Sequence, residues 1–330
     1  MMKISANVLE AVGNTPLVRL NHITAGIPAT VCVKLEASNP GRSVKDRIAL
    51  AVVEDAERKG LLKPGGTIVE PTSGNMGVAL AIVAAVKGYK CIFTIPDKMS
   101  IEKIRRLRAF GAEVVVTPTA VPPESPQSYY SVARRLADEI PGAYMPMQYD
   151  NLANREAHYR STGPEIWQQT DGKVDAFVST VGTGGTLAGT STFLREMKKD
   201  IVIGCADPRG AAMYNLFAHG EAKATEGGSI TEGIGLGRVT PIIEDIKCEK
   251  AYLIPDEEAI PYIFDLLEHE GLCLGGSSAI NIAGAVRLAK DLGPGKTIVT
   301  LLCDSGTRYQ SKLYNRAFLE QKGLPAPDWL

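Results

Sequence analysis

Residues 67–77 read Thr67-Ile68-Val69-Glu70-Pro71-Thr72-Ser73-Gly74-Asn75-Met76-Gly77, an apolar run that passes through a polar turn into a helical pattern. We interpret residues 67–70 as a buried strand and residues 76–87, which are rich in alanine and valine, as a helix. Residues 91–95 form a second apolar run, which Pro96 ends. A strand, a helix and another strand in this order predict a parallel sheet with helices on its faces.

The same alternation continues on both sides of this stretch. On the N-terminal side, Ser43 can cap a helix that runs to about Arg58, with Asp46 as its reciprocal partner. On the C-terminal side we expect helices at 100–110, from about 186, and at 278–290, and strands at 113–116, 176–179, 201–204 and 297–302. The chain is therefore predicted to be an α/β protein.

Two stretches do not follow this alternation. Residues 117–127 carry four prolines, and residues 207–241 carry many glycines and little periodicity. Loops of that length are usually functional or mobile. We therefore expect two lobes of one catalytic unit over residues 1–330: a smaller mobile lobe at 46–150, and a larger lobe formed by 1–45 and 151–330.

Composition excludes several classes of protein. The chain has 330 residues, a net charge of -1, 45% hydrophobic and 22% charged residues, as an ordinary globular protein has. Near-neutral charge gives no reason to expect nucleic acid or an anionic membrane as partner. The first seven residues lack a basic region followed by an apolar core, so no secretion signal is expected.

The cysteines and histidines predict neither disulfides nor a metal site. The six cysteines are scattered without a Cys-x-x-Cys pair, and the four histidines lack the spacing of metal ligands. Reduced thiols of this kind are typical of a cytoplasmic protein. We therefore predict a cytoplasmic enzyme without a bound metal.

A glycine-rich loop, Gly182-Thr183-Gly184-Gly185-Thr186, follows the expected strand at 176–179 and opens a helix. Glycines allow backbone N–H groups to approach an anion closely, and a helix N-terminus favours negative charge. A dinucleotide site is the alternative reading. Leu187 stands where its third glycine should be, whereas Asp207 lies at a suitable distance downstream, so the loop alone does not exclude an oxidoreductase.

Two further features suggest a site for a phosphorylated aldehyde. The loop at 71–77 offers hydroxyls, an amide and N–H groups for a carboxylate, although Ser73 or Asn75 can equally serve as a helix cap. Lys45 stands in the first turn of a helix, where helix polarity and burial both lower an amine's pKa. A neutral amine can form a Schiff base with an aldehyde.

The chain resembles a known family over nearly its full length. It is similar to the fold-type II enzymes that use pyridoxal 5'-phosphate (PLP), which are tryptophan synthase β-like, and within them to the cysteine synthase and cystathionine β-synthase group. This resemblance implies two lobes, each with a mostly parallel sheet flanked by helices. The motifs that carry it are Gly13-Asn14-Thr15-Pro16-Leu17, Asn39-Pro40-Gly41-Arg42-Ser43-Val44-Lys45-Asp46-Arg47, residues 70–77, residues 182–186 and Gly275-Gly276-Ser277-Ser278.

The resemblance implies a role for each matching residue. Lys45 is the catalytic residue and the cofactor's Schiff-base lysine, Asn75 hydrogen-bonds the cofactor's 3′ oxygen, and Ser277 faces the pyridine nitrogen. The phosphate is held by Gly182, Thr183, Gly184, Gly185 and Thr186. The amino acid substrate's carboxylate is held by Thr72, Ser73 and Gln148, with Met76 in the same loop.

The reaction implied is β-replacement on an activated L-serine. Lys45 removes the α-proton, the β-group leaves to give an α-aminoacrylate intermediate, and a thiol or sulfide adds. We expect a cysteine synthase, a transferase that makes L-cysteine and acetate from O-acetyl-L-serine and sulfide. The alternatives are cystathionine β-synthase, which joins serine and homocysteine, and then a serine or threonine dehydratase, a lyase. A homodimer is implied, and a serine acetyltransferase is a possible partner.

Three residues depart from the family's commoner pattern. Arg42 and Ala279 stand where glycine is frequent, and Met76 replaces a threonine that could bind a carboxylate. Arg42 is expected either to bind an anionic substrate or to point into solvent. Met76 bears on substrate specificity and not on the class of reaction.

Overall fold

The computed structural model describes residues 4–72, 74–97, 99, 101–122 and 124–330. The chain forms two compact units. The first unit contains Met1–Gly13 and Asn39–Asn154, and the second contains Asn14–Ser38 and Arg155–Leu330. These bounds differ from the expected ones, because the turn before the first helix belongs to the first unit together with Lys45. Local hydrogen bonds explain this: Asn39 accepts from the Gly13 amide at 2.8 Å, and its carbonyl accepts from the Arg42 amide at 2.8 Å.

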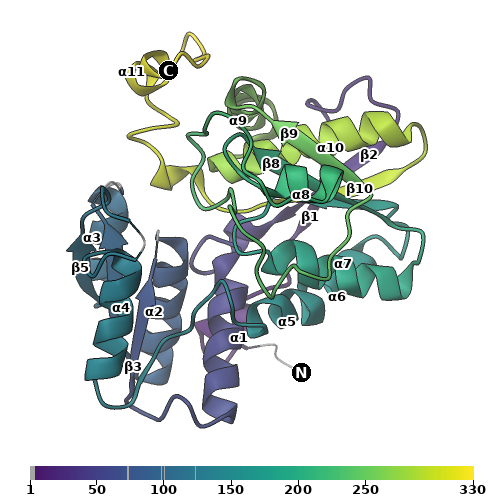
Figure 1. The fold of residues 1–330 in the computed structure, drawn as a ribbon. Coiled ribbons are helices and arrows are strands. Elements are labelled where there is room, and N and C mark those ends of the chain that lie inside the picture. The colour runs from purple at the N-terminus through teal and green to yellow at the C-terminus, as the bar shows by residue number, and fades with distance from the viewer. Residues whose placement is uncertain (1–3, 73, 98, 100, 123) are drawn as a thin grey trace. The chain divides into compact units, whose positions relative to one another are not determined.

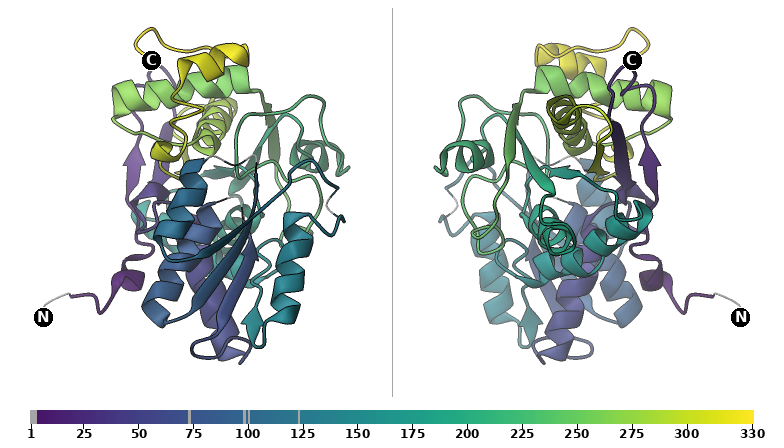
Figure 2. Two further views of the ribbon diagram at one scale, coloured as in Figure 1. Left: turned by 90° about the vertical axis from the view of Figure 1, so that its left-hand side faces the viewer. Right: turned by 90° about the vertical axis from the view of Figure 1, so that its right-hand side faces the viewer.

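The first unit is built on a four-stranded parallel sheet in the order β5-β4-β3-β6. Its strands are β3 (Thr67–Pro71), β4 (Lys90–Pro96), β5 (Glu113–Thr117) and β6 (Ala143–Tyr144). Its helices are η1 (Val8–Ala11), α1 (Lys45–Arg58), α2 (Asn75–Lys87), α3 (Ile101–Ala109) and α4 (Tyr129–Glu139). Helix α2 packs on β3 and β4 and against α1 and α3, while α4 packs on β3, β4 and β6 (Figures 1 and 2).

The second unit is built on a six-stranded sheet in the order β1-β2-β10-β7-β8-β9, parallel except for β1. Its strands are β1 (Leu17–Arg19), β2 (Thr30–Leu35), β7 (Ala176–Ser179), β8 (Val202–Pro208), β9 (Lys250–Ile254) and β10 (Thr297–Leu302). Its helices are η2 (Glu36–Ser38), α5 (Ala153–Arg160), α6 (Thr162–Gln169), α7 (Gly185–Met197), α8 (Met213–His219), α9 (Asp256–Glu270), α10 (Gly276–Leu292), η3 (Gly306–Arg308) and α11 (Arg316–Gln321). Helices α10 and α9 lie on one side of the sheet in Figure 1, and α6 and α7 on the other.

Each unit has its own apolar core between sheet and helices. In the first unit, Ile48 and Val52 of α1 pack with Leu80 of α2 and Phe93 of β4, all fully buried. In the second, α10 is buried along nearly its whole length against the sheet, as a helix rich in alanine, isoleucine and glycine should be. No helix in the described part of the chain is long and apolar enough to cross a membrane.

The sequence predictions hold for the main elements and fail in two places. The predicted strands at 67–70, 91–95, 113–116, 176–179 and 297–302 all exist as β3, β4, β5, β7 and β10. The stretch 207–241 is not wholly irregular, since it contains α8. The predicted cap of α1 is right only in part: the Ser43 hydroxyl accepts from the Lys45 amide at 3.3 Å, but the N-cap residue is Val44, and the Asp46 carboxylate accepts from the Gly41 amide.

Candidate cofactor and substrate site

In the first unit, Lys45 is the first residue of α1 and is half-buried. The preceding turn is tight: Arg42 has φ +60, and a Cβ on Gly41 would lie 2.4 Å from the Asp46 carboxylate. Only glycine leaves room for that carboxylate to bind the Gly41 amide. The turn therefore fixes the residue at which α1 begins, and with it the position of Lys45. Arg42 itself is exposed.

The polar loop after β3 leads into α2, and Asn75 is that helix's first residue. Gly74 is the N-cap residue, and the side-chain oxygen that caps the helix comes from Thr72, whose hydroxyl oxygen accepts from the amides of Gly74 at 3.0 Å and Gly77 at 3.1 Å. Sequence reasoning had given this capping role to Ser73 or Asn75. Ser73 lies outside the described residues. Thr72 keeps its hydroxyl hydrogen for another acceptor, so capping is compatible with binding a carboxylate.

Met76 is only 2% exposed and packs in the core of the first unit. Its side chain therefore supports α2, and its predicted contact with substrate stays a prediction. Gly77 beside it has no room for a side chain, since a Cβ would lie 2.8 Å from Leu107 and 2.9 Å from Thr72.

Gln148 follows β6, the strand that pairs with β3 in parallel. The carboxyl ends of β3 and β6 therefore lie at one edge of the sheet, which is where parallel sheets bind ligands. Gln148 is nearly buried, and its backbone N–H donates to Glu70 of β3 at 3.3 Å. Burial raises the pKa of Glu70 to about 8, against the opposing effect of hydrogen bonds from Gln148 and Met147.

In the second unit, the 182–186 loop joins β7 to α7 and is closely packed. A Cβ on Gly182 would lie 2.3 Å from the carbonyl oxygen of Gly233. Gly184 has φ +96, and its Cβ would lie 2.1 Å from Ile243. Neither position has room for a side chain. The backbone amides of this loop are therefore not covered by side chains of Gly182 or Gly184.

The first amides of α7 are the groups that fit a phosphate. The N–H groups of a helix's first turn have no partner within the helix, and the helix dipole favours an anion there. The Thr186 hydroxyl lies 3.2 Å from Nε2 of His158, whose Nδ1 lies 2.9 Å from the Thr162 hydroxyl. Asn281 accepts from the Thr180 amide at 2.7 Å and so fixes the start of the loop. The residues present fit a phosphorylated cofactor.

Ser277 is the second residue of α10 and is 6% exposed. The turn before it is dense, because a Cβ on Gly275 would lie 2.3 Å from Asp304 and one on Gly276 would lie 2.8 Å from Thr231. Ser278 accepts from the Cys303 amide at 3.0 Å and ties this helix start to the end of β10. Since β10 pairs with β7, Ser277 and the glycine loop lie at the carboxyl edge of the same sheet.

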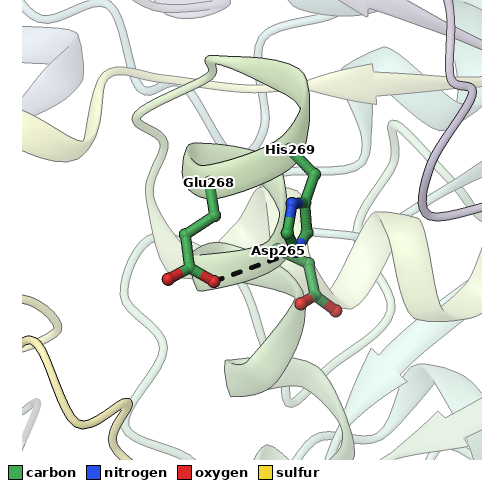
Figure 3. A group of neighbouring side chains, drawn as sticks. All are labelled: Asp265, Glu268 and His269. Carbon is green, nitrogen blue, oxygen red and sulfur yellow. Dashed lines mark ion pairs between the residues drawn. The ribbon is translucent and has the colours of Figure 1, made fainter.

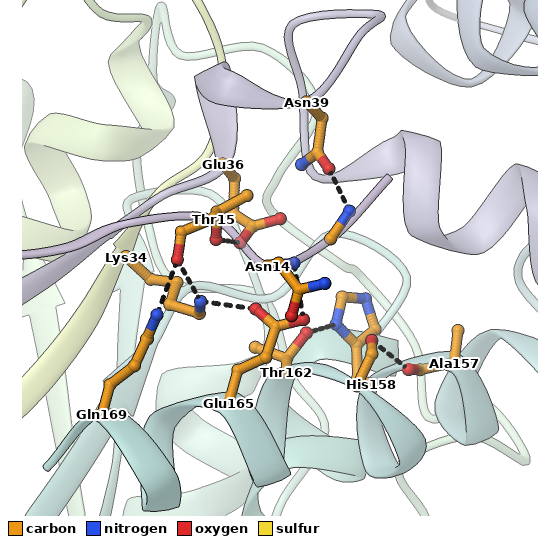
Figure 4. A network of polar contacts seen from close by, with 12 residues as sticks. Asn14, Thr15, Lys34, Glu36, Asn39, Ala157, His158, Thr162, Glu165 and Gln169 are labelled. Atoms are coloured by element: carbon orange, nitrogen blue, oxygen red, sulfur yellow. Dashed lines mark hydrogen bonds and ion pairs between the residues drawn. The ribbon is translucent and has the colours of Figure 1, made fainter. Parts of the chain in front are cut away.

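A buried polar network holds the segment that begins with Asn14 and Thr15 (Figure 4). Lys34 is fully buried, forms an ion pair with Glu165 at 2.5 Å and donates to the Thr15 carbonyl at 2.6 Å. Gln169 donates to the same carbonyl at 3.0 Å, and Glu165 accepts from the Asn14 amide at 3.0 Å. Asn14 and Thr15 of the motif at 13–17 are therefore fixed within the second unit by buried polar side chains.

One group among the described residues has metal-like geometry. Asp265, Glu268 and His269 lie along α9 with ligand atoms within 4.8 Å of one another (Figure 3). The group lies on an accessible face of the helix, and Glu268 already accepts from the indole of Trp329. Exposed groups of this kind are common without a metal, so this one carries no functional argument.

Comparison with known proteins identifies the family. A family profile described as "Pyridoxal-phosphate dependent enzyme" matches residues 8–304. The chain belongs to this family. It is a fold-type II enzyme whose cofactor is PLP, as the motifs predicted.

The individual relatives of this chain include cysteine synthases and cystathionine β-synthases. The chain is 47% identical over 326 residues to cysteine synthase 1 of Neurospora crassa, covering 97% of this chain and 86% of the relative. It is 44% identical over 324 residues to cystathionine beta-synthase of Rattus norvegicus, covering 98% of this chain but 57% of the relative. A solved O-acetylserine dependent cystathionine beta-synthase from Helicobacter pylori superposes with a TM-score of 0.85 at 34% identity, covering 94% of this chain and 99% of that one.

The predicted site residues divide between the units. The first unit carries Lys45, Thr72, Asn75, Met76 and Gln148, and the second carries Gly182, Thr183, Gly184, Gly185, Thr186 and Ser277. Their individual roles stay predictions. Sequence reasoning missed Glu70, although a carboxylate at the end of the apolar run 67–71 was a visible signal of a buried acid.

Proposed function

We propose that this enzyme is a cysteine synthase, which makes L-cysteine and acetate from O-acetyl-L-serine and sulfide. The observation that carries the proposal is the 47% identity to cysteine synthase 1 of Neurospora crassa, which extends over 97% of this chain and 86% of the relative. A second cysteine synthase 1, from Emericella nidulans, is equally similar over 96% of the chain.

The site residues suit β-replacement. When bound, PLP supplies an electron sink that weakens the bonds of the substrate's α-carbon. Lys45 would hold the cofactor through its amine and transfer the α-proton, and the amides at 184–186 would hold its phosphate. Asn75 would position the cofactor ring. Ser277, an uncharged partner for the ring nitrogen, would leave that nitrogen largely unprotonated and so favour fast departure of the β-group.

The substrate's carboxylate would be bound at the carboxyl edge of the first unit's sheet. Thr72 offers a hydroxyl hydrogen there, Gln148 offers a side-chain amide, and Ser73 is proposed as a further donor. A carboxylate bound by several neutral donors is held equally well before and during reaction. Loss of one donor should therefore raise KM more than it lowers kcat.

The test is a matrix of two donors and two nucleophiles. Purified enzyme with PLP is offered O-acetylserine or serine, each with sulfide or homocysteine, and the products are separated by chromatography. Cysteine from O-acetylserine and sulfide, as the fastest reaction, supports the proposal. Pyruvate that forms at the same rate with or without a thiol would instead identify a dehydratase.

Cystathionine synthesis is the second candidate, because the chain is also 44% identical to mammalian cystathionine beta-synthases. It spans 57% of their length. Fastest turnover with serine and homocysteine, or with O-acetylserine and homocysteine, would favour this function over cysteine synthesis. The same matrix thus decides between the two.

We further propose that the enzyme is a homodimer in the cytoplasm, and that a serine acetyltransferase can bind it. The family resemblance supports the homodimer and the binding of an acetyltransferase. The six free thiols support the cytoplasmic location, because they suit a reducing compartment. Light scattering on the purified protein measures the oligomeric state. Titration with the acetyltransferase's C-terminal peptide tests the docking.

A further inference from the structure

Glu70 is a buried acid whose partners are amides. It lies in β3 and is 1% exposed. Its Oε2 accepts from the Met147 amide at 3.0 Å, and its Oε1 accepts from the Gln148 amide at 3.3 Å. A buried carboxyl costs several kcal/mol in desolvation unless its acceptor sites are filled, so these donors are what make Glu70 tolerable in the core.

The backbone at Met147 is shaped to present these donors. Met147 has φ +53, a left-handed conformation that costs an ordinary residue about 1–2 kcal/mol. Such a residue turns successive amides toward one side and forms a concave anion site. Here that site is filled from within the protein, by the Glu70 carboxylate. The strain at Met147 is maintained because Glu70 compensates for it.

The backbone carbonyl of Gln148 is held in place as well. Its carbonyl accepts from the Asn154 side-chain amide at 2.8 Å. Asn151 donates to the Pro146 carbonyl at 3.0 Å and to the Tyr144 hydroxyl at 3.2 Å, which braces the same segment. The backbone N–H and the backbone carbonyl of Gln148 are thus each bonded to a named group.

The backbone bonds of this segment determine where the Gln148 side chain starts. The two oxygens of Glu70 accept from the backbone amides of Met147 and Gln148, and a carboxyl oxygen can accept a hydrogen bond in either protonation state. Because the N–H and the carbonyl of Gln148 are both held, its main chain is fixed where the side chain begins. The NH₂ group of that side chain can then donate to an anionic ligand.

We propose that Glu70 is the positioning residue that orients Gln148 to bind the carboxylate of the amino acid substrate. The inference rests on the proposed function, since it assumes that Gln148 contacts this carboxylate. Glu70 does not touch substrate and acts only through Gln148. Its effect should therefore appear in substrate binding and should disappear when Gln148 is removed.

The test is a double-mutant cycle measured as KM for the amino acid donor. Glu70→Gln keeps the shape but sets an NH₂ group against the backbone amides. We expect it to raise KM about tenfold or more, the effect of one hydrogen bond to a charged group, with kcat changed less than twofold. Gln148→Ala should raise KM similarly, and the double variant should match Gln148→Ala alone.

Controls separate positioning from general damage. Glu57→Gln removes another carboxylate of the first unit, which binds Lys87 and Tyr89, and should leave KM unchanged. Each variant must keep the wild-type PLP absorbance and circular dichroism spectrum. Should Glu70→Gln fail to fold, Glu70→Asp replaces it: this variant keeps the carboxyl group but is one methylene too short to reach both amides. It is expected to raise KM as well.

Two results would overturn the inference. One is a KM for Glu70→Gln, or for Glu70→Asp in its place, equal to that of the wild type. The other is a double variant whose KM is the product of the two single effects, which would show that Glu70 acts independently of Gln148. Failure of the proposed function is recognised separately, because the unmodified enzyme would then form cystathionine or pyruvate faster than cysteine.

Discussion

Replacing Gly182 by alanine tests whether close packing shapes the proposed phosphate loop. The added Cβ would lie 2.3 Å from the Gly233 carbonyl oxygen, whereas ordinary contact begins at 3.4 Å. The obstacle is main chain, so no side-chain rotation relieves it. The loop or the Gly233 segment must therefore move by about 1 Å, an overpacking that costs about 1–3 kcal/mol.

A displacement of this size should weaken the binding of the cofactor without unfolding the protein. The amides proposed to hold the phosphate lie two to four residues after Gly182, and a 1 Å error in such a group can cost about 100-fold. We expect Gly182→Ala to bind PLP about 100-fold more weakly. Its melting temperature should also fall, and added PLP should restore part of the loss.

The assay is titration of cofactor-free protein with PLP, followed by absorbance and by the thermal transition. Gly228→Ala is the matched control, because a Cβ there meets no atom within 4 Å and its φ is not positive. Wild-type affinity in Gly182→Ala would refute the packing argument. Equal loss in both variants would refute it too, since the effect would then follow from any alanine in these loops.

Four further predictions concern single residues. Lys45→Ala should keep the wild-type circular dichroism spectrum but lose borohydride fixation of PLP and about 10²–10⁴-fold in turnover; a fixed label on another lysine would contradict this. Arg42→Gly should raise the free energy of unfolding in urea by about 0.5–1 kcal/mol, because glycine relieves the left-handed backbone, and reduced stability would contradict it. Lys34→Met should lower the same free energy by about 3–5 kcal/mol by leaving Glu165 without its buried partner, and a change under 1 kcal/mol would show that the pair is unimportant. Burial raises the pKa of Asp207 from 3.8 to about 7. Between about pH 4 and 7 the folded protein therefore keeps a proton on Asp207 that the unfolded chain has lost, so the contribution of this proton to the free energy of unfolding falls as pH rises through that window. Asp207→Asn should flatten the pH dependence of the free energy of unfolding in urea over the same window.

The fold could be predicted where a short apolar run has clear boundaries. The strand predicted at 297–302 has the same bounds in the structure, because Lys296 precedes it, Asp304 follows within two residues, and its own residues are β-branched or leucine. Other elements gave weaker signals. Strand β6 has two residues, and α9 contains Pro261, which in a sequence indicates the end of a helix. Tertiary packing preserves both elements.

The site could be predicted as motifs, but not as a hydrogen-bonded arrangement. Spacing alone made Ser43 and Asp46 a capping pair, yet Asp46 binds the Gly41 amide, which no spacing rule anticipates. Capping by Thr72 was missed for the same reason. The partnership of Glu70 with Gln148 joins residues 78 positions apart, and only the pairing of β3 with β6 brings them together.

The register of β2 has a consequence for synthesis of the protein. Thr30 to Leu35 pair in parallel with Thr297 to Leu302, the last strand of the chain. On the ribosome, the first unit's sheet is complete once residue 144 has emerged, whereas β2 has β1 on one edge but waits for the partner of its other edge, which follows more than 260 residues later. Such late closure is slow and leaves an apolar strand exposed to other nascent chains. Chains that stall or are cut before residue 297 should therefore be targets for chaperones and proteases, even though their N-terminal sheet has already formed.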